Sequence, residues 1–408
     1  MIPAQERTIL RDLARRVAEI AALPIMAQRR RLWKLHNSLR GERPMILVFP
    51  ERAWRELLPD SALVCETERA RRMEWELRSR IYYHEHLCDD TVIEKDWIVS
   101  KVIRSSGWGL EARHIASPSA TGAWAFDPVI REPADLRKLR FPEISVDEKA
   151  TRENLAEAQE VLADILDVRL RGVAHISFHL MNLYTGLRGL AEVMMDMYDR
   201  PGMLHDAMAF FEEGHRRIIE QYVGLNLLSL NNDRTYHSSG GVGYTDELPQ
   251  AGFDPEHVRP RDLWASAEAQ EMAQVSPKMH AEFSLAYEKR LLEPFGLNGY
   301  GCCEDLTLKL PDVLTIPNLR RVSISPFANV DACAAGLGDR CIFSWKPHPA
   351  HLVGRFDEAA LRRYIGHTLD VARGCHLEMI LKDTHTCENH PERFARWTEI
   401  ARELVDAG

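Results

Sequence analysis

Short apolar runs alternate with amphipathic stretches along most of the chain. The runs have the length and β-branched content of buried strands, and the stretches between them carry apolar residues at helical spacing. The apolar runs are 45–49, 173–178, 225–230, 296–300, 321–324, 341–344 and 377–381. The helical stretches are 189–220, 277–293, 357–372 and 391–405. This alternation predicts βα units and a parallel sheet.

The first 165 residues are less regular. Residues 5–40 predict one or two amphipathic helices, so we take 1–40 as an N-terminal helical extension. Residues 51–165 follow the first predicted strand and mix helical patterns with segments that have no regular periodicity. They predict a long insertion. With an eighth strand expected in the insertion or near 258–267, we predict one (β/α)8 TIM-type barrel over residues 41–408. An open doubly wound nucleotide fold is disfavoured, because no strand is followed by Gly-x-Gly-x-x-Gly.

Composition narrows the class of protein. The chain is 45% hydrophobic and 28% charged, which is ordinary for a globular enzyme. Its net charge of -9 and its mixed charge pattern argue against nucleic-acid binding. Apolar stretches stay well short of the ~20 residues of a membrane span, and the N-terminus lacks the apolar core of a secretory signal. We therefore expect no membrane partner, a cytoplasmic location and reduced cysteines.

Polar side chains gather directly after the predicted strands. In a TIM-type barrel the active site lies at this carboxyl end of the strands. The residues singled out there are His179, Asp233, Tyr236, His237, Cys302, Cys303, Glu304, Trp345, Lys346, His348, His385 and Cys387.

The thiols and imidazoles among these residues predict a zinc site. Zn²⁺ prefers Cys, His and carboxylate ligands, and two strand ends can meet across the mouth of a barrel. We expect Cys303 and Cys387 as ligands, with His385 and Cys302 as further candidates. Neighbouring side chains on a strand diverge, so Cys302 and Cys303 are not expected to pair with each other. The alternative is that these cysteines pack beneath a turn and that His385 bonds backbone carbonyls.

The remaining candidates predict proton transfer and substrate contacts. His237, Glu304 and His385 are candidate acids and bases. Candidate substrate contacts are His179, Asp233, Tyr236, Trp345, Lys346 and His348. Lys346 is expected either to pair with an anionic group or to extend its amine into solvent. The glycine-rich loop 240–243, together with its neighbours, is expected either to bind substrate or to act only as a lid. His84 and His86 are expected to form either a second metal site or part of a polar rim.

Four segments resemble the uroporphyrinogen-decarboxylase-like superfamily. Residues 28–50, which end in Gly-Glu-Arg-Pro-Met-Ile-Leu-Val-Phe-Pro, resemble the opening of these domains. Residues 275–287 resemble the helix before their metal-bearing strand. Residues 299–305 (Gly-Tyr-Gly-Cys-Cys-Glu-Asp) fall where its corrinoid-dependent methyltransferases carry His-x-Cys, and residues 383–387 fall near their second Cys. The similarity covers most of residues 28–405 and is weakest across 100–165.

The resemblance implies a zinc-dependent methyltransferase. Such an enzyme moves a methyl group between a small substrate, of the methoxylated aromatic or methylamine type, and a corrinoid (cobalamin). The corrinoid is expected on a separate carrier protein, because the chain lacks Asp-x-His-x-x-Gly. A homodimer is compatible with this reading. The alternatives are a metal-assisted decarboxylase or lyase, and a non-catalytic relative that binds a tetrapyrrole or corrinoid.

Two departures from the family pattern bear on this reading. Gly301 stands where the methyltransferases carry their histidine ligand, so His385 or Glu304 would have to replace it. Residues 27–31 (Ala-Gln-Arg-Arg-Arg) are not the Arg-Gln-Ala-Gly-Arg segment with which uroporphyrinogen decarboxylases grip their substrate. The second departure disfavours the tetrapyrrole decarboxylase.

Overall fold

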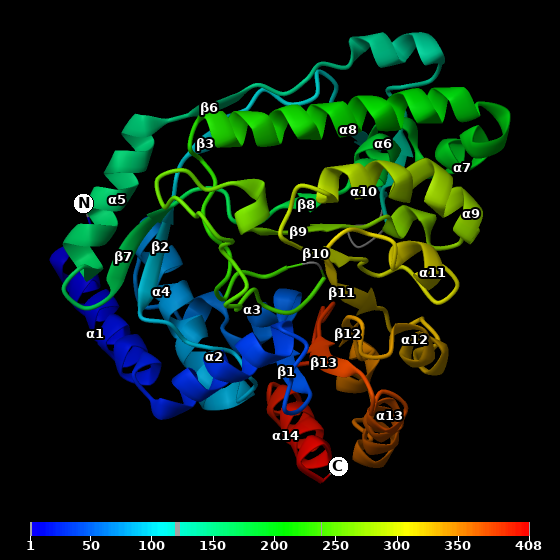
Figure 1. The fold of residues 1–408 in the computed structure, drawn as a ribbon. Coiled ribbons are helices and arrows are strands. Elements are labelled where there is room, and N and C mark those ends of the chain that lie inside the picture. The colour runs from blue at the N-terminus through cyan, green and yellow to red at the C-terminus, as the bar shows by residue number, and fades with distance from the viewer. Residues whose placement is uncertain (1, 119–122, 238, 408) are drawn as a thin grey trace.

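A parallel sheet of seven strands lies at the centre of the fold (Figure 1). The computed structural model describes residues 2–118, 123–237 and 239–407. The strand order is β1 (Met45–Val48), β13 (His376–Leu381), β12 (Ile342–Trp345), β11 (Leu319–Ile324), β10 (Leu297–Tyr300), β9 (Trp264–Ala267) and β8 (Ser177–Phe178). β1, β9, β10 and β12 are buried at every position, as expected for parallel strands that are covered on both faces. The predicted α/β class is confirmed.

Helices between the strands cover the outside of the sheet (Figure 1). The predicted stretches 357–372 and 391–405 are α13 (Glu358–Val371) and α14 (Glu392–Ala407). The stretch 277–293 is α9 (Pro277–His280), a π-helical turn and α10 (Ala286–Leu292), while 189–220 divides into α7 (Leu190–Asp199) and α8 (Pro201–Gly224). The other connecting helices are α6 (Leu180–Arg188), α11 (Leu310–Val313) and α12 (Val330–Leu337).

The strand prediction was wrong for residues 225–230. α8 continues to Gly224, Asn226 takes a left-handed φ of 49°, and Leu228 makes one isolated parallel bridge with Val173. The eighth predicted strand does exist, as β9. Across the described residues no strand pairing joins the edge strands β1 and β8, so closure of the sheet into a barrel is not observed.

The side chain of Asn231 takes over the pairing that a strand at 225–230 would supply. Its amide nitrogen donates to the carbonyl oxygens of Ala174 (2.8 Å) and Trp264 (2.9 Å), and its amide oxygen accepts from the Trp264 N–H (2.9 Å). Asn231 is fully buried, so each of these groups would be costly to leave without a partner. One amide thus links the segment before β8 to β9.

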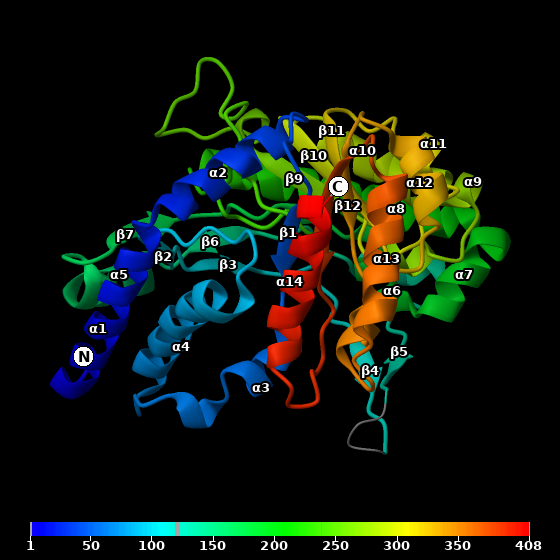
Figure 2. The same ribbon diagram turned by 90° about the horizontal axis from the view of Figure 1, so that it is seen from below.

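The N-terminal helices and residues 51–165 form a second packed region beside the sheet. α1 (Ala4–Ala21) packs on α4 (Glu68–Tyr82) and α5 (Glu148–Leu162), and β2 (Asp96–Ser100) pairs with β7 (Asp167–Arg171). The smaller elements are α3 (Trp54–Leu57), the pair β3 (Ile103–Ser105) with β6 (Ile144–Val146), and the pair β4 (Arg113–Ile115) with β5 (Ala125–Asp127). Figure 2 shows β4 and β5 next to α6. No helix in the described ranges is long and apolar enough to cross a membrane.

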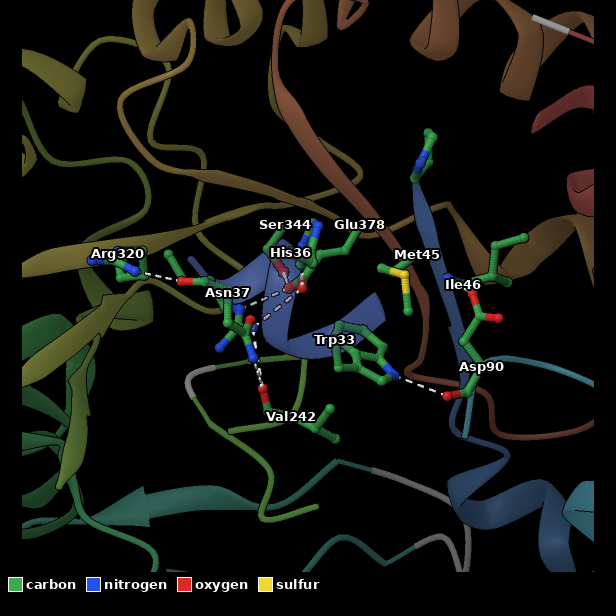
Figure 3. A network of polar contacts seen from close by, with 12 residues as sticks. Trp33, His36, Asn37, Met45, Ile46, Asp90, Val242, Arg320, Ser344 and Glu378 are labelled. Carbon is green, nitrogen blue, oxygen red and sulfur yellow. Dashed lines mark hydrogen bonds and ion pairs between the residues drawn. The ribbon is translucent and has the colours of Figure 1, made fainter. Parts of the chain in front are cut away.

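A buried ionic cluster joins α2 (Pro24–Asn37) to the strands of the sheet (Figure 3). Glu378 of β13 accepts hydrogen bonds from Arg321 of β11 (2.8 Å) and from Ser344 of β12 (2.5 Å). Its other oxygen lies 3.1 Å from Nε2 of His36, at the end of α2. Burial alone would raise the pKa of Glu378, but Arg321 and His36 hold that pKa well below its usual range. Glu378 is therefore an anion inside the protein.

We predict that Glu378→Gln destabilises the fold by about 3–5 kcal/mol, because it leaves the buried Arg321 without its counter-charge. Urea denaturation measures this free energy of unfolding. Glu403→Gln is the matched control, since Glu403 pairs with Arg362 at the surface, where such a pair contributes about 0–1 kcal/mol. Equal losses in the two variants would contradict the ionic role of Glu378.

Candidate active site

Reactive side chains from four strands converge at the carboxyl end of the sheet. His179 follows β8, Glu268 follows β9, Cys302 and Cys303 follow β10, and Lys382 with Asp383 follows β13. In parallel α/β folds this edge carries the ligand and the catalytic groups. We describe these residues as one candidate site.

The two neighbouring cysteines of this site face each other. Their Sγ atoms are 3.5 Å apart. Ser239 donates to Sγ of Cys302 (3.4 Å), and Sγ of Cys303 lies 3.8 Å from a carboxylate oxygen of Asp383. The prediction that their side chains diverge was wrong, because β10 ends at Tyr300 and Gly301 turns the backbone with φ of 94°. Both cysteines therefore lie in a turn rather than in a strand.

This arrangement makes the two thiols chemically different. The hydrogen bond from Cys303 outweighs burial and lowers the pKa of Cys302 to about 6, and Ser239 and Lys382 add to the effect. The pKa of Cys303 is raised, because its proton serves that hydrogen bond. Cys302 is therefore the more acidic thiol of the pair, and it becomes the thiolate before Cys303 does.

Glu304 holds the turn that carries the cysteines. Its carboxyl accepts from the backbone N–H of Cys302 (2.8 Å) and from that of Ala269 (3.3 Å). It therefore connects the ends of β10 and β9. Burial, with repulsion from Glu268, raises the pKa of Glu304 to about 7. The structure thus places this predicted acid beneath the thiols.

His179 and Glu268 form a short ion pair beside the thiols. Nδ1 of His179 lies 2.5 Å from Oε1 of Glu268. The other carboxylate oxygen of Glu268 accepts a hydrogen bond from the backbone N–H of Gln270 (2.8 Å). Burial opposes the charged imidazole, but the hydrogen bond and charge of Glu268 raise the pKa of His179, and the charge of Cys302 adds to them. This imidazole is well suited to donate a proton.

An aromatic cavity of about 650 Å³ opens next to Cys303. Its aromatic walls come from residues 108–114 and 124–126, within the predicted insertion, and its other walls from α6, Leu190 and residues 270–271. The aromatic lining residues are Trp108, His114, Trp124 and Phe126, and the polar ones include Asn182, Gln270 and Glu271. Such a lining suits a small, largely apolar ring with a few polar substituents.

Residues 231–237, predicted as part of the rim, are placed in two ways. Tyr236 lies near the thiols: its ring meets Phe49 edge-on at 5.2 Å, and burial raises its pKa while the charges of Lys382 and Cys302 act on it. Asp233 instead pairs with Arg171 (3.1 Å). His237 is buried against Trp264, and its Nε2 lies 2.9 Å from the carbonyl oxygen of Asn231. Burial lowers the pKa of His237 to about 3, so its ring is neutral.

Residues 345–348 also differ from the predicted rim. Trp345 packs against Tyr364 of α13 with ring centroids 5.1 Å apart. Lys346 is buried and donates to Oγ of Ser344 (2.7 Å), and burial lowers its pKa to about 7. Nδ1 of His348 accepts from the Ala350 N–H (3.1 Å) and caps a short 3-10 helix. None of these three contacts is with a group of the thiol site.

The predicted zinc ligands do not assemble in this arrangement. The thiol of Cys387 donates to Glu56 (3.0 Å), and His385 is exposed. Within residues 2–118, 123–237 and 239–407, no three His, Cys, Asp or Glu side chains group so that they could hold a metal ion. That finding covers the second site suggested near His84 and His86 as well. The zinc site therefore stays a prediction.

Four residues of this site were not singled out from the sequence. Glu268 was missed because residues 258–267 gave only a vague strand signal. Lys382 and Asp383 directly follow a predicted strand, and this position could have identified them as candidate site residues. Ser239 lies in the glycine-rich loop, whose packing depends on distant strands. The aromatic residues of the cavity lie in a part of the sequence where the hydrophobic positions show no helical or strand periodicity.

Comparisons with protein-family models and with curated proteins find no match for this chain.

We predict that Cys302 reacts with iodoacetamide along a pH curve with its midpoint near 6, because the thiolate is the reactive form and persists down to that pH. Peptide mapping of alkylated protein measures the rate at each pH. Cys303→Ala removes the main stabilising hydrogen bond and is expected to move the midpoint upward. A midpoint near 9 in the unchanged protein would contradict the thiolate assignment, and Cys88, whose pKa is raised, is the internal reference.

We also predict that Cys387→Ser leaves the zinc content of the purified chain unchanged, because its thiol is bound to Glu56 rather than to the cysteine pair. Elemental analysis of the variant beside the unchanged protein measures this. Cys375→Ser is the matched control. A loss of zinc confined to Cys387→Ser would restore Cys387 as a ligand.

Proposed function

We propose that this chain is a methyltransferase that takes a methyl group from a small methoxylated aromatic compound and passes it to a corrinoid on a carrier protein. One observation carries the proposal: Cys303 lines the aromatic cavity, its Sγ lies 3.5 Å from that of Cys302, and the charge of Cys302 acts on His179 of the His179–Glu268 pair. The cavity suits the ring, and the polar groups stand where a methoxy substituent would react. The (β/α)8 barrel and the acceptor are those implied by the family resemblance.

In the proposed reaction the bond between oxygen and the methyl carbon breaks, the methyl group passes to the acceptor, and the oxygen takes a proton. His179 is the proton donor, because Glu268 favours its charged form. The Cys302 thiolate places negative charge beside a methyl carbon that gains positive charge as the bond breaks. Glu304 acts through the turn that it holds and is a positioning residue. No step requires zinc.

The experiment is to incubate the protein with a methoxylated benzoate and cob(I)alamin. We expect methylcobalamin and the demethylated phenol in equal amounts, followed by absorbance and chromatography. His179→Asn is expected to lower kcat roughly 10²–10⁴-fold, because the proton donor is lost. His367→Asn is the control, since His367 pairs with Asp331 at the surface.

Two outcomes would overturn the proposal. Carbon dioxide released from a carboxylated donor, with no methylation of cobalt, would favour the decarboxylase. Methyl transfer that is unchanged in His179→Asn and in Cys302→Ser would place the chemistry elsewhere on the molecule.

A further inference from the structure

The distance between the sulfur atoms of Cys302 and Cys303 determines which reactions the pair can undergo. The two Sγ atoms are 3.5 Å apart, while a disulfide bond is about 2.0 Å long. Direct oxidation would thus require the side chains to approach, and joined neighbours would have Cα atoms only about 3.8 Å apart, closer than in ordinary disulfides. Two sulfurs at this separation are instead suited to bind one atom placed between them.

The pair is held in this geometry before any ligand arrives. Gly301 turns the chain, Ser239 donates to Cys302, and Cys303 lies against the carboxylate of Asp383. Side chains that are already ordered lose little conformational entropy on binding, so a bidentate ligand gains affinity. Cys303 also lines the aromatic cavity, which leaves room for an organic group on the bound atom.

The required number of ligands selects the kind of atom. A structural zinc ion takes four ligands, and among the described residues no group of three His, Cys, Asp or Glu side chains is arranged so that it could hold a metal ion. Thiolates prefer soft partners. Trivalent arsenic with one organic substituent needs only two sulfurs to complete its valence.

We propose that Cys302 and Cys303 form a chelating dithiol that binds trivalent organoarsenic compounds, with the organic group in the aromatic cavity. In the reaction, a compound R–As(OH)2 meets both thiols. Two As–S bonds form and two As–O bonds break. Two water molecules leave, with one proton from the Cys303 thiol and one from solvent when Cys302 is the thiolate, and arsenic stays trivalent. The occupied pair closes the thiol end of the cavity. This proposal does not depend on methyl transfer.

The test uses the full-length, reduced protein and phenylarsine oxide. Native mass spectrometry is expected to show one bound phenylarsenic group per chain. Peptide mapping after iodoacetamide treatment should show that Cys302 and Cys303 become protected together, while the other six of the eight cysteines keep their reactivity. The dithiol 2,3-dimercaptopropanol should release the group, whereas an equal concentration of 2-mercaptoethanol should not.

Variants separate chelation from binding by single thiols. Cys302→Ser and Cys303→Ser are each expected to weaken binding roughly 10²–10⁴-fold, the usual gain from a second linked contact. Cys88→Ser, which removes an exposed thiol, should bind as the unchanged protein does. Unchanged binding in both site variants, or protection of only one of the two cysteines in the unchanged protein, would overturn the proposal. These readouts require no activity, so they succeed or fail independently of the methyl-transfer assay.

Discussion

The carboxylate of Glu378 is the buried charge on which the arrangement of the sheet depends. It lies on β13 and binds Arg321 of β11, Ser344 of β12 and His36 of α2, so one group ties three strands to the N-terminal region. A buried carboxylate is costly unless it is paired and fully hydrogen-bonded. Only the register in which these residues align satisfies it. The polar cluster thus selects one packing of the sheet from those that apolar contacts alone would permit.

The glycine-rich loop is shaped by the same cluster. A side chain at Gly241 would come within 2.5 Å of the Arg321 guanidinium, and one at Gly240 would come within 2.9 Å of Ile380. The carbonyl oxygen of Val242 accepts a hydrogen bond from Asn37, next to His36 (Figure 3). These contacts favour the interpretation of a packed loop over that of a lid. They also fix Ser239, which reaches Cys302.

Two parts of the chain contribute different groups to the candidate site. The sheet supplies the reactive groups at its carboxyl end, where the backbone is rigid and distances such as the 2.5 Å between His179 and Glu268 can be held. Residues 108–114 and 124–126 supply the aromatic walls of the cavity, which Cys303 also lines. Substrate choice can therefore change through these residues while the thiol pair stays in place.

The sequence by itself determined the α/β class, most strands and helices, and the polar strand ends that include Cys302, Cys303 and His179, because these follow from periodicity within short windows. Tertiary structure decided the rest. Residues 225–230 make one isolated bridge, and the side chain of Asn231 binds Ala174 and Trp264, residues far along the chain. The thiol of Cys387 donates to Glu56, 331 residues earlier in the chain. The turn at Gly301 brought two neighbouring thiols face to face. Such outcomes depend on contacts between distant segments, which no local pattern encodes.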